Sequence, residues 1–138
     1  MMDVVISILG TVDDGHSVDK IEFSTVGKYT RDGSRYELSY EDGQMMGETV
    51  TSRITVDADG SAVIERSGGL NSRLNIKPGV RSQSSYQIPE GELLIGINGI
   101  TVDNRLGATG GKLTLRYSID VNAALQSKNE VVVTVKEA

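Results

Sequence analysis

The amino-acid sequence predicts an all-β protein with about ten short antiparallel strands and no helix. Two observations lead to this prediction. Apolar and polar side chains alternate with a period of two, which is typical of strands with one buried face. Turn-forming pairs containing glycine recur throughout, and the chain has 16 glycines but only two prolines. The 138 residues fit a single domain, residues 1–138, with one core.

The alternation can be followed along the chain. The expected inward-facing sets are Ile21, Phe23, Thr25, Gly27, Tyr29; Tyr36, Leu38, Tyr40; Leu70, Leu74, Ile76; Leu113, Leu115, Tyr117, Ile119, Val121; and Val131, Val133, Val135. All six aromatic residues fall on inward faces, and five of them are tyrosines. The interior is therefore expected to carry five hydroxyls that need hydrogen-bond partners, as a core or as the lining of a pocket.

Glycine-containing pairs are expected to separate the strands. They are Asp14-Gly15, Asp32-Gly33, Asp42-Gly43, Asp59-Gly60, Gly68-Gly69, Pro78-Gly79, Glu90-Gly91, Asn98-Gly99 and Gly110-Gly111. Asn98-Gly99 fits either a tight hairpin or a bulge in one long strand from Glu92 to Leu106. If Ile76 and Ser82 share the inner face, the loop between them needs an odd number of residues. The segment 122–129 permits a helix but is too short to predict one.

Many short antiparallel strands in a small chain must hide their edges. A closed or nearly closed barrel does this most completely, and a two-sheet sandwich is the alternative. The one-sided alternation of the strands fits both.

Composition excludes several kinds of chemistry. Without cysteine there are no disulfides, thiolate metal sites or cysteine nucleophiles, and the absence favours a cytoplasmic location. His16 is the only histidine and is expected in an exposed loop, so multi-histidine metal sites are excluded within one chain. The sequence near Asp57 fits a hairpin turn better than a calcium loop. No apolar run is long enough to span a membrane, and the first residues lack a signal-peptide pattern.

Charge is unevenly distributed along the chain. The net charge of −5 argues against broad binding to nucleic acids or anionic membranes. Residues 66–89, however, contain four cations and no acid. Three of the four, Arg73, Lys77 and Arg81, are expected on one outer face. This patch would suit an acidic protein or a nucleic-acid strand, or would simply keep the surface solvated.

Arg66 is the fourth of these cations and is expected to point inward. It follows Ala62 and Ile64 at alternate positions, so the three side chains are expected on the same face of one strand. A buried guanidinium needs a carboxylate, a carbonyl cluster or a bound anion. The alternative is a structural arginine that holds the Gly68-Gly69 turn or lies at a barrel rim.

Several segments in consistent order resemble the YwiB-like proteins, an uncharacterised bacterial family. They are Ile21-Glu22-Phe23 with Gly27; Tyr36-Glu37-Leu38-Ser39-Tyr40-Glu41; Gly60 and Val63 before Arg66-Ser67-Gly68; Tyr86 before Gly91-Glu92-Leu93; and Gly111 before Leu113, Leu115 and Tyr117. The resemblance implies a calycin-like β-barrel, which favours the barrel over the sandwich, and suggests a ligand cavity. The chain lacks the helical lid of fatty-acid-binding proteins and the tryptophan signature of lipocalins. The family offers no binding residues to carry over.

The leading hypothesis is a non-enzymatic barrel of about eight to ten strands that binds a small, partly polar or anionic ligand without a cofactor or metal. The expected lining is Tyr36, Tyr40, Tyr86 and Tyr117, with Arg66 as the anchor of a negative group. One alternative is a filled barrel that uses Arg73, Lys77 and Arg81 to bind a partner. Another is an enzyme built on inward carboxylates and tyrosines.

Overall fold

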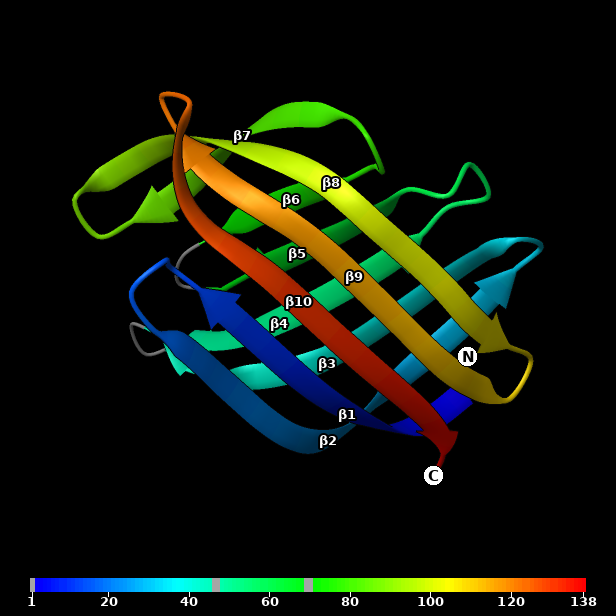
Figure 1. The fold of residues 1–138 in the computed structure, drawn as a ribbon. Coiled ribbons are helices and arrows are strands. Elements are labelled where there is room, and N and C mark those ends of the chain that lie inside the picture. The colour runs from blue at the N-terminus through cyan, green and yellow to red at the C-terminus, as the bar shows by residue number, and fades with distance from the viewer. Residues whose placement is uncertain (1, 46–47, 69–70) are drawn as a thin grey trace.

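A computed structural model describes residues 2–45, 48–68 and 71–138. The described residues form ten strands and no helix (Figure 1). The strands are β1 (Met2–Asp13), β2 (Val18–Asp32), β3 (Arg35–Met45), β4 (Glu48–Val56), β5 (Ala62–Ser67), β6 (Ser72–Ile76), β7 (Arg81–Ile88), β8 (Gly91–Gly107), β9 (Gly110–Val121) and β10 (Ala124–Glu137). No helix in this part of the chain is long and apolar enough to cross a membrane.

The strands form one closed antiparallel barrel. Each strand pairs with its neighbour in the chain, and β1 pairs with β10 to close the sheet. The closing ladder runs from Val4 opposite Glu137 to Asp13 opposite Lys128. The predicted all-β barrel is therefore confirmed, and the sandwich is excluded.

Alternate residues of the strands point into one shared core, as the period of two predicts. The fully buried members include Ile6 on β1, Leu38 on β3, Ile97 on β8, Leu113 on β9 and Val133 on β10. Because the side-chain period is two, a shift of one residue in any ladder would turn that strand's apolar face outward. Leu70, which was also expected inside, lies outside the described residues.

One end of the barrel is plugged by aromatic side chains. The rings of Tyr29 and Tyr36 stack with 6.2 Å between centroids, and the Arg31 guanidinium lies 5.7 Å from the Tyr36 centroid. The Tyr29 hydroxyl donates a 2.6 Å hydrogen bond to the carbonyl of Gly107, the last residue of β8. Burial raises the pKa of Tyr29 to about 12, so this phenol stays neutral. Both chain termini lie at this end (Figure 1).

Two of the expected turns are bulges within strands. The ladder between β8 and β9 shifts register between Gly99 and Thr101, so Asn98-Gly99 bends one long strand. This confirms the second of the two readings of that pair. Asp42-Gly43 was expected to separate strands but lies inside β3, where the β3–β4 ladder shifts between Glu41 and Gln44. Turn-forming residues also permit bulges, and only the neighbouring strand decides between the two.

The connection between β6 and β7 differs from the expected odd-numbered loop. Lys77 and Val80 pair directly, so Pro78-Gly79 is a two-residue turn. Ser82 nevertheless faces inward, because it pairs with the buried Ile97. The register slips by one residue between the turn and the next pair, Ser72 with Tyr86.

The turn between β9 and β10 was not predicted. Asn122 and Ala123 both have positive φ, 52° and 66°, as in the type I′ turns that connect tight hairpins. No glycine marks this position, and alanine is uncommon in the left-handed region.

Replacing Gly99 with alanine should destabilise the protein. An added Cβ would lie 2.1 Å from the backbone oxygen of Lys77. The Pro78-Gly79 turn and the bulge at Gly99 would therefore have to move apart. We expect a loss of about 2–3 kcal/mol in the free energy of unfolding, measured by urea denaturation. The control is Gly10→Ala, whose Cβ would meet its nearest atom at 4.0 Å. Equal effects at the two positions would contradict this packing argument.

Candidate functional site

A cavity of about 300 Å³ occupies the barrel interior at the end opposite the aromatic plug. Nine of the ten strands contribute to its lining: Ile8, Gly10, Val12, Ile21, Phe23, Tyr40, Ile54, Ile64, Arg66, Ser72, Leu74, Tyr86, Tyr117, Ile119 and Val131. Val12 and Ile21 face inward yet are 37% and 62% exposed, because the cavity opens to solvent beside the β1–β2 loop. We call this the open end.

A polar belt crosses the inner face of five adjacent strands. Its members are Tyr40 on β3, Ser52 on β4, Arg66 on β5, Ser72 on β6 and Tyr86 on β7. Each is the register partner of the next, so their Cα atoms follow one row across the sheet. Neighbouring strands lie about 4.8 Å apart, which brings consecutive members within contact range. All except the buried Ser52 line the cavity.

The opposite wall of the cavity is mainly apolar. It is formed by Ile8, Phe23, Ile119 and Val131 from β1, β2, β9 and β10. The cavity thus has one wall with a guanidinium and hydroxyls and another with hydrocarbon.

Tyr117 on β9 contributes the third phenol of the cavity and is 7% exposed. Burial raises the pKa of Tyr117, the charge of Arg66 opposes this rise, and Tyr86 adds to it. The Tyr40 ring contacts Phe23, with 6.0 Å between centroids. The Tyr117 hydroxyl therefore stays neutral and can both donate and accept a hydrogen bond.

The structure brings together four of the five residues expected to bind a ligand: Arg66, Tyr40, Tyr86 and Tyr117. It places Tyr36 at the plugged end instead, stacked on Tyr29. Tyr36 and Tyr40 share a strand face, but Tyr40 lies four positions further along β3, which is about 13 Å away. Ser52 and Ser72 were missed, because a serine gains significance here only once the strand register is known.

The outer cations expected to form a basic patch have acidic neighbours. Arg73 lies 3.9 Å from Glu65 on β5, and Arg81 binds Asp120 on β9 at 2.7 Å. Lys77 lies beside the β6–β7 turn. The sequence segment 66–89 contains no acid, but adjacent strands supply them, so the surface carries mixed charge.

Asp120 is a buried carboxylate on the outer side of the sheet. It accepts hydrogen bonds from Arg81 Nε at 3.1 Å, Arg81 Nη2 at 2.7 Å and Asn98 Nδ2 at 3.0 Å. The arginine reaches it across Gly96, where a Cβ would lie 2.2 Å from Nη2. These bonds, above all those from Arg81, lower the pKa of Asp120 to about 2.

Asp120 should make stability depend on pH in the acid range. Its folded pKa lies below the ordinary aspartate value of 3.8, so its contribution to stability is present above pH 3.8 and is lost as the pH falls toward 2. Asp120→Asn should therefore lower Tm at neutral pH. The difference in Tm between the variant and the parent protein should shrink as the pH falls from 3.8 toward 2. Asp103→Asn, at an exposed Arg105 pair, is the matched control. A pH-independent difference would contradict this role of the carboxylate.

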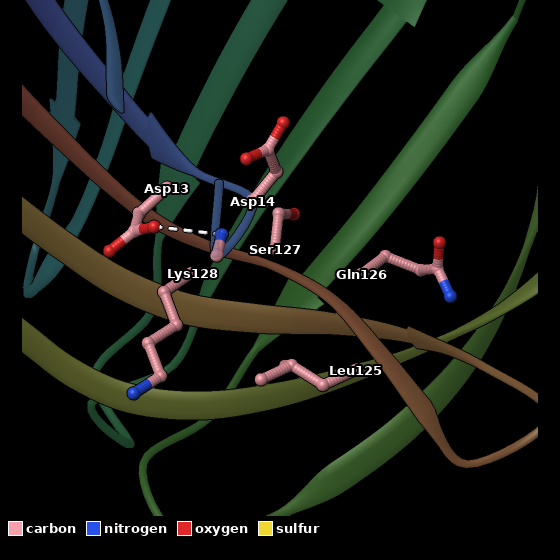
Figure 2. Close-up of a pocket in the computed structure, with 7 residues that line it drawn as sticks. Asp13, Asp14, Leu125, Gln126, Ser127 and Lys128 are labelled. Atoms are coloured by element: carbon pink, nitrogen blue, oxygen red, sulfur yellow. Dashed lines mark hydrogen bonds between the residues drawn. The ribbon is translucent and has the colours of Figure 1, made fainter. Parts of the chain in front are cut away.

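A second hollow, of about 190 Å³, lies between the β1–β2 loop and the start of β10 (Figure 2). Asp13 accepts the Gly15 N–H at 2.9 Å, and Asp14 accepts those of His16 and Ser17 at 2.8 Å. These bonds lower the pKa of Asp14 and fix the loop. His16 is exposed there, as expected.

The shape of this second hollow does not suggest a binding site. In Figure 2 the labelled side chains spread around the hollow rather than converging. No described residues form a metal-binding group of three or more His, Cys, Asp or Glu.

Fold and site together define a ten-stranded antiparallel barrel with an aromatic plug at one end and a cavity at the open end. The family model described as a domain of unknown function, DUF1934, matches residues 6–133, and the chain belongs to this family.

The relatives found agree with the fold. The uncharacterized beta-barrel protein YwiB of Bacillus subtilis (strain 168) is 21% identical over 131 residues, covering 95% of this chain and 91% of YwiB. The crystal structure of the ywiB protein from Bacillus subtilis superposes with a TM-score of 0.87 at 20% identity, covering 99% of this chain and 92% of that one. The resemblance noted in the sequence is confirmed, and the likeness in structure shows the fold alone.

Proposed function

We propose that the protein binds, in the cavity at the open end, a small ligand that combines an apolar body with a negatively charged or strongly polar group. The observation that carries the proposal is the division of the cavity between an apolar wall and the polar belt. Its volume of about 300 Å³ falls at the lower end of the range of small-molecule sites. Such sites are typically apolar with a few polar groups that fix the orientation of the ligand.

Arg66 is the cationic member of the belt and suits a carboxylate or phosphate. A guanidinium can donate two parallel hydrogen bonds to either group. Its register neighbours Ser52 and Ser72 are hydroxyl-bearing residues, and Ser72 also lines the cavity. An anionic head would therefore lie near Arg66, and its apolar part would contact Phe23, Ile119 and Val131.

The lining supports binding more than acid–base catalysis. The described lining residues include no carboxylate and no histidine. The burial of Tyr117 raises its pKa, which makes it a weaker acid and not a base at neutral pH. The alternative of a filled barrel with an outer binding patch is less well supported, because the cavity is open and Arg73 and Arg81 have acidic neighbours.

Replacing Arg66 should separate recognition of charge from recognition of hydrocarbon. Octanoate should bind the parent protein more tightly than 1-octanol, as measured by calorimetry. Arg66→Met keeps an apolar stem but removes the charge, and should weaken octanoate binding about tenfold while leaving the alcohol unchanged. Arg66→Lys should recover part of the loss. If the parent protein binds neither probe, or binds both equally, an anion site at Arg66 is ruled out.

Filling the cavity should abolish binding without unfolding the barrel. Ile119 lines the cavity and is partly exposed, so the larger side chain of Ile119→Trp can occupy the empty volume. Octanoate binding should disappear, with Tm close to that of the parent protein. Leu94→Trp is the control, because Leu94 is 60% exposed on β8, which is absent from the lining. Binding that survives in Ile119→Trp would place the ligand elsewhere.

A further inference from the structure

The first half of β2 has a partner on one side only among the described residues. Val18–Val26 pair with β1, whereas the β2–β3 ladder covers only Gly27 to Asp32. Beyond that point β3 continues to Met45 paired with β4, with a bulge in that ladder between Glu41 and Gln44. Figure 1 shows β2 bowing away from β3 along this stretch. A hollow of about 500 Å³ lies where the strands separate, lined from both by residues that include Thr25, Val26 and Tyr40.

This leaves an edge of about 30 Å at roughly 3.3 Å per residue. Alternate N–H and C=O groups of an edge strand point away from its own ladder and can pair with another strand. The edge contains no proline, and Val18, Ile21 and Val26 are 56%, 62% and 65% exposed. Exposed apolar residues on a long free edge mark a site of association.

We infer that this edge pairs antiparallel with the same edge of a second copy of the chain, with Ile21 opposite the partner's Ile21. In this register Lys20 lies opposite the partner's Glu22, and the two-fold symmetry repeats the pair. A register centred on Glu22 would instead place two glutamates opposite each other, which is unfavourable. The order of charges on the edge is thus complementary to itself.

The inferred contact also involves the open end. Ile21 faces inward and lines the cavity, although it is 62% exposed. In the dimer, the partner's Ile21 would cover it on the same face of the continuous sheet. Each copy would then supply an apolar residue to the rim of the other's cavity. The dimer itself does not depend on what the cavity binds.

Single cysteines test the register directly, because the natural chain has none. Opposite residues in antiparallel strands have Cα separations of about 4.5–5.5 Å, which a disulfide can bridge. Under mild oxidation Ile21→Cys should give a covalent dimer rapidly. Val26→Cys is the matched control, since it lies on the same edge and is at least as exposed, but is not opposite itself. Equal rates of cross-linking at the two positions would overturn the inference.

Charge variants test the pairing without a covalent bond. The parent protein should sediment as a monomer–dimer equilibrium. Lys20→Glu should weaken the dimer about tenfold, because it places like charges opposite each other twice. Adding Glu22→Lys to Lys20→Glu should restore the affinity of the parent protein. Lys112→Glu, on the outer face of β9, should have no effect. A protein that stays monomeric at all concentrations, or a dimer that is insensitive to Lys20→Glu, would refute the inference.

Discussion

The pairing of β1 with β10 is the contact on which the rest of the structure depends. It closes the sheet, so the inward faces of all ten strands surround one common core, which their alternating inward side chains fill. In a closed barrel, inward side chains also differ by their position along the barrel axis. At one end Tyr29 and Tyr36 fill the interior, and at the other the inward side chains leave a cavity. Core and candidate site are thus two levels of the same inner face.

The five tyrosines divide according to this axial position. The Tyr29 hydroxyl is satisfied by the Gly107 carbonyl, and Tyr29 belongs to the buried core. Tyr36 stacks on Tyr29, contacts Arg31 and packs partly buried against that core. Tyr40, Tyr86 and Tyr117 face the cavity. A phenol can serve in both settings, since its ring packs against hydrocarbon while its hydroxyl bonds to backbone or to a ligand.

Local patterns predicted what depends on nearest neighbours in the chain. Alternation identified the inward residues. Arg66 shares the strand face of Ala62 and Ile64 and lines the cavity, but it is exposed rather than buried. What depends on distant strands could not be read. The ion pair of Arg81 with Asp120 joins residues 39 positions apart. Tyr36 was grouped with the cavity residues because alternation along a strand predicts which face a side chain is on. It does not predict where along the barrel axis that side chain lies. The bulge at Asp42-Gly43 has the same local sequence pattern as a turn.

Incomplete pairing around the cavity follows from these bulges and slips. Among the described residues β6 and β7 share one register pair, Ser72 with Tyr86, besides the bridge at their turn. Between them the hydroxyls of Ser82 and Ser84 donate to the carbonyls of Asn75 and Arg73, in place of backbone N–H groups. No comparable side-chain bonds are seen along the Val18–Val26 edge of β2 within the described part of the chain. The first gap is closed by the protein's own side chains, whereas along the second no described residue pairs with the backbone groups on the β3 side of Val18–Val26. This contrast is why the inferred dimer adds its strand at β2.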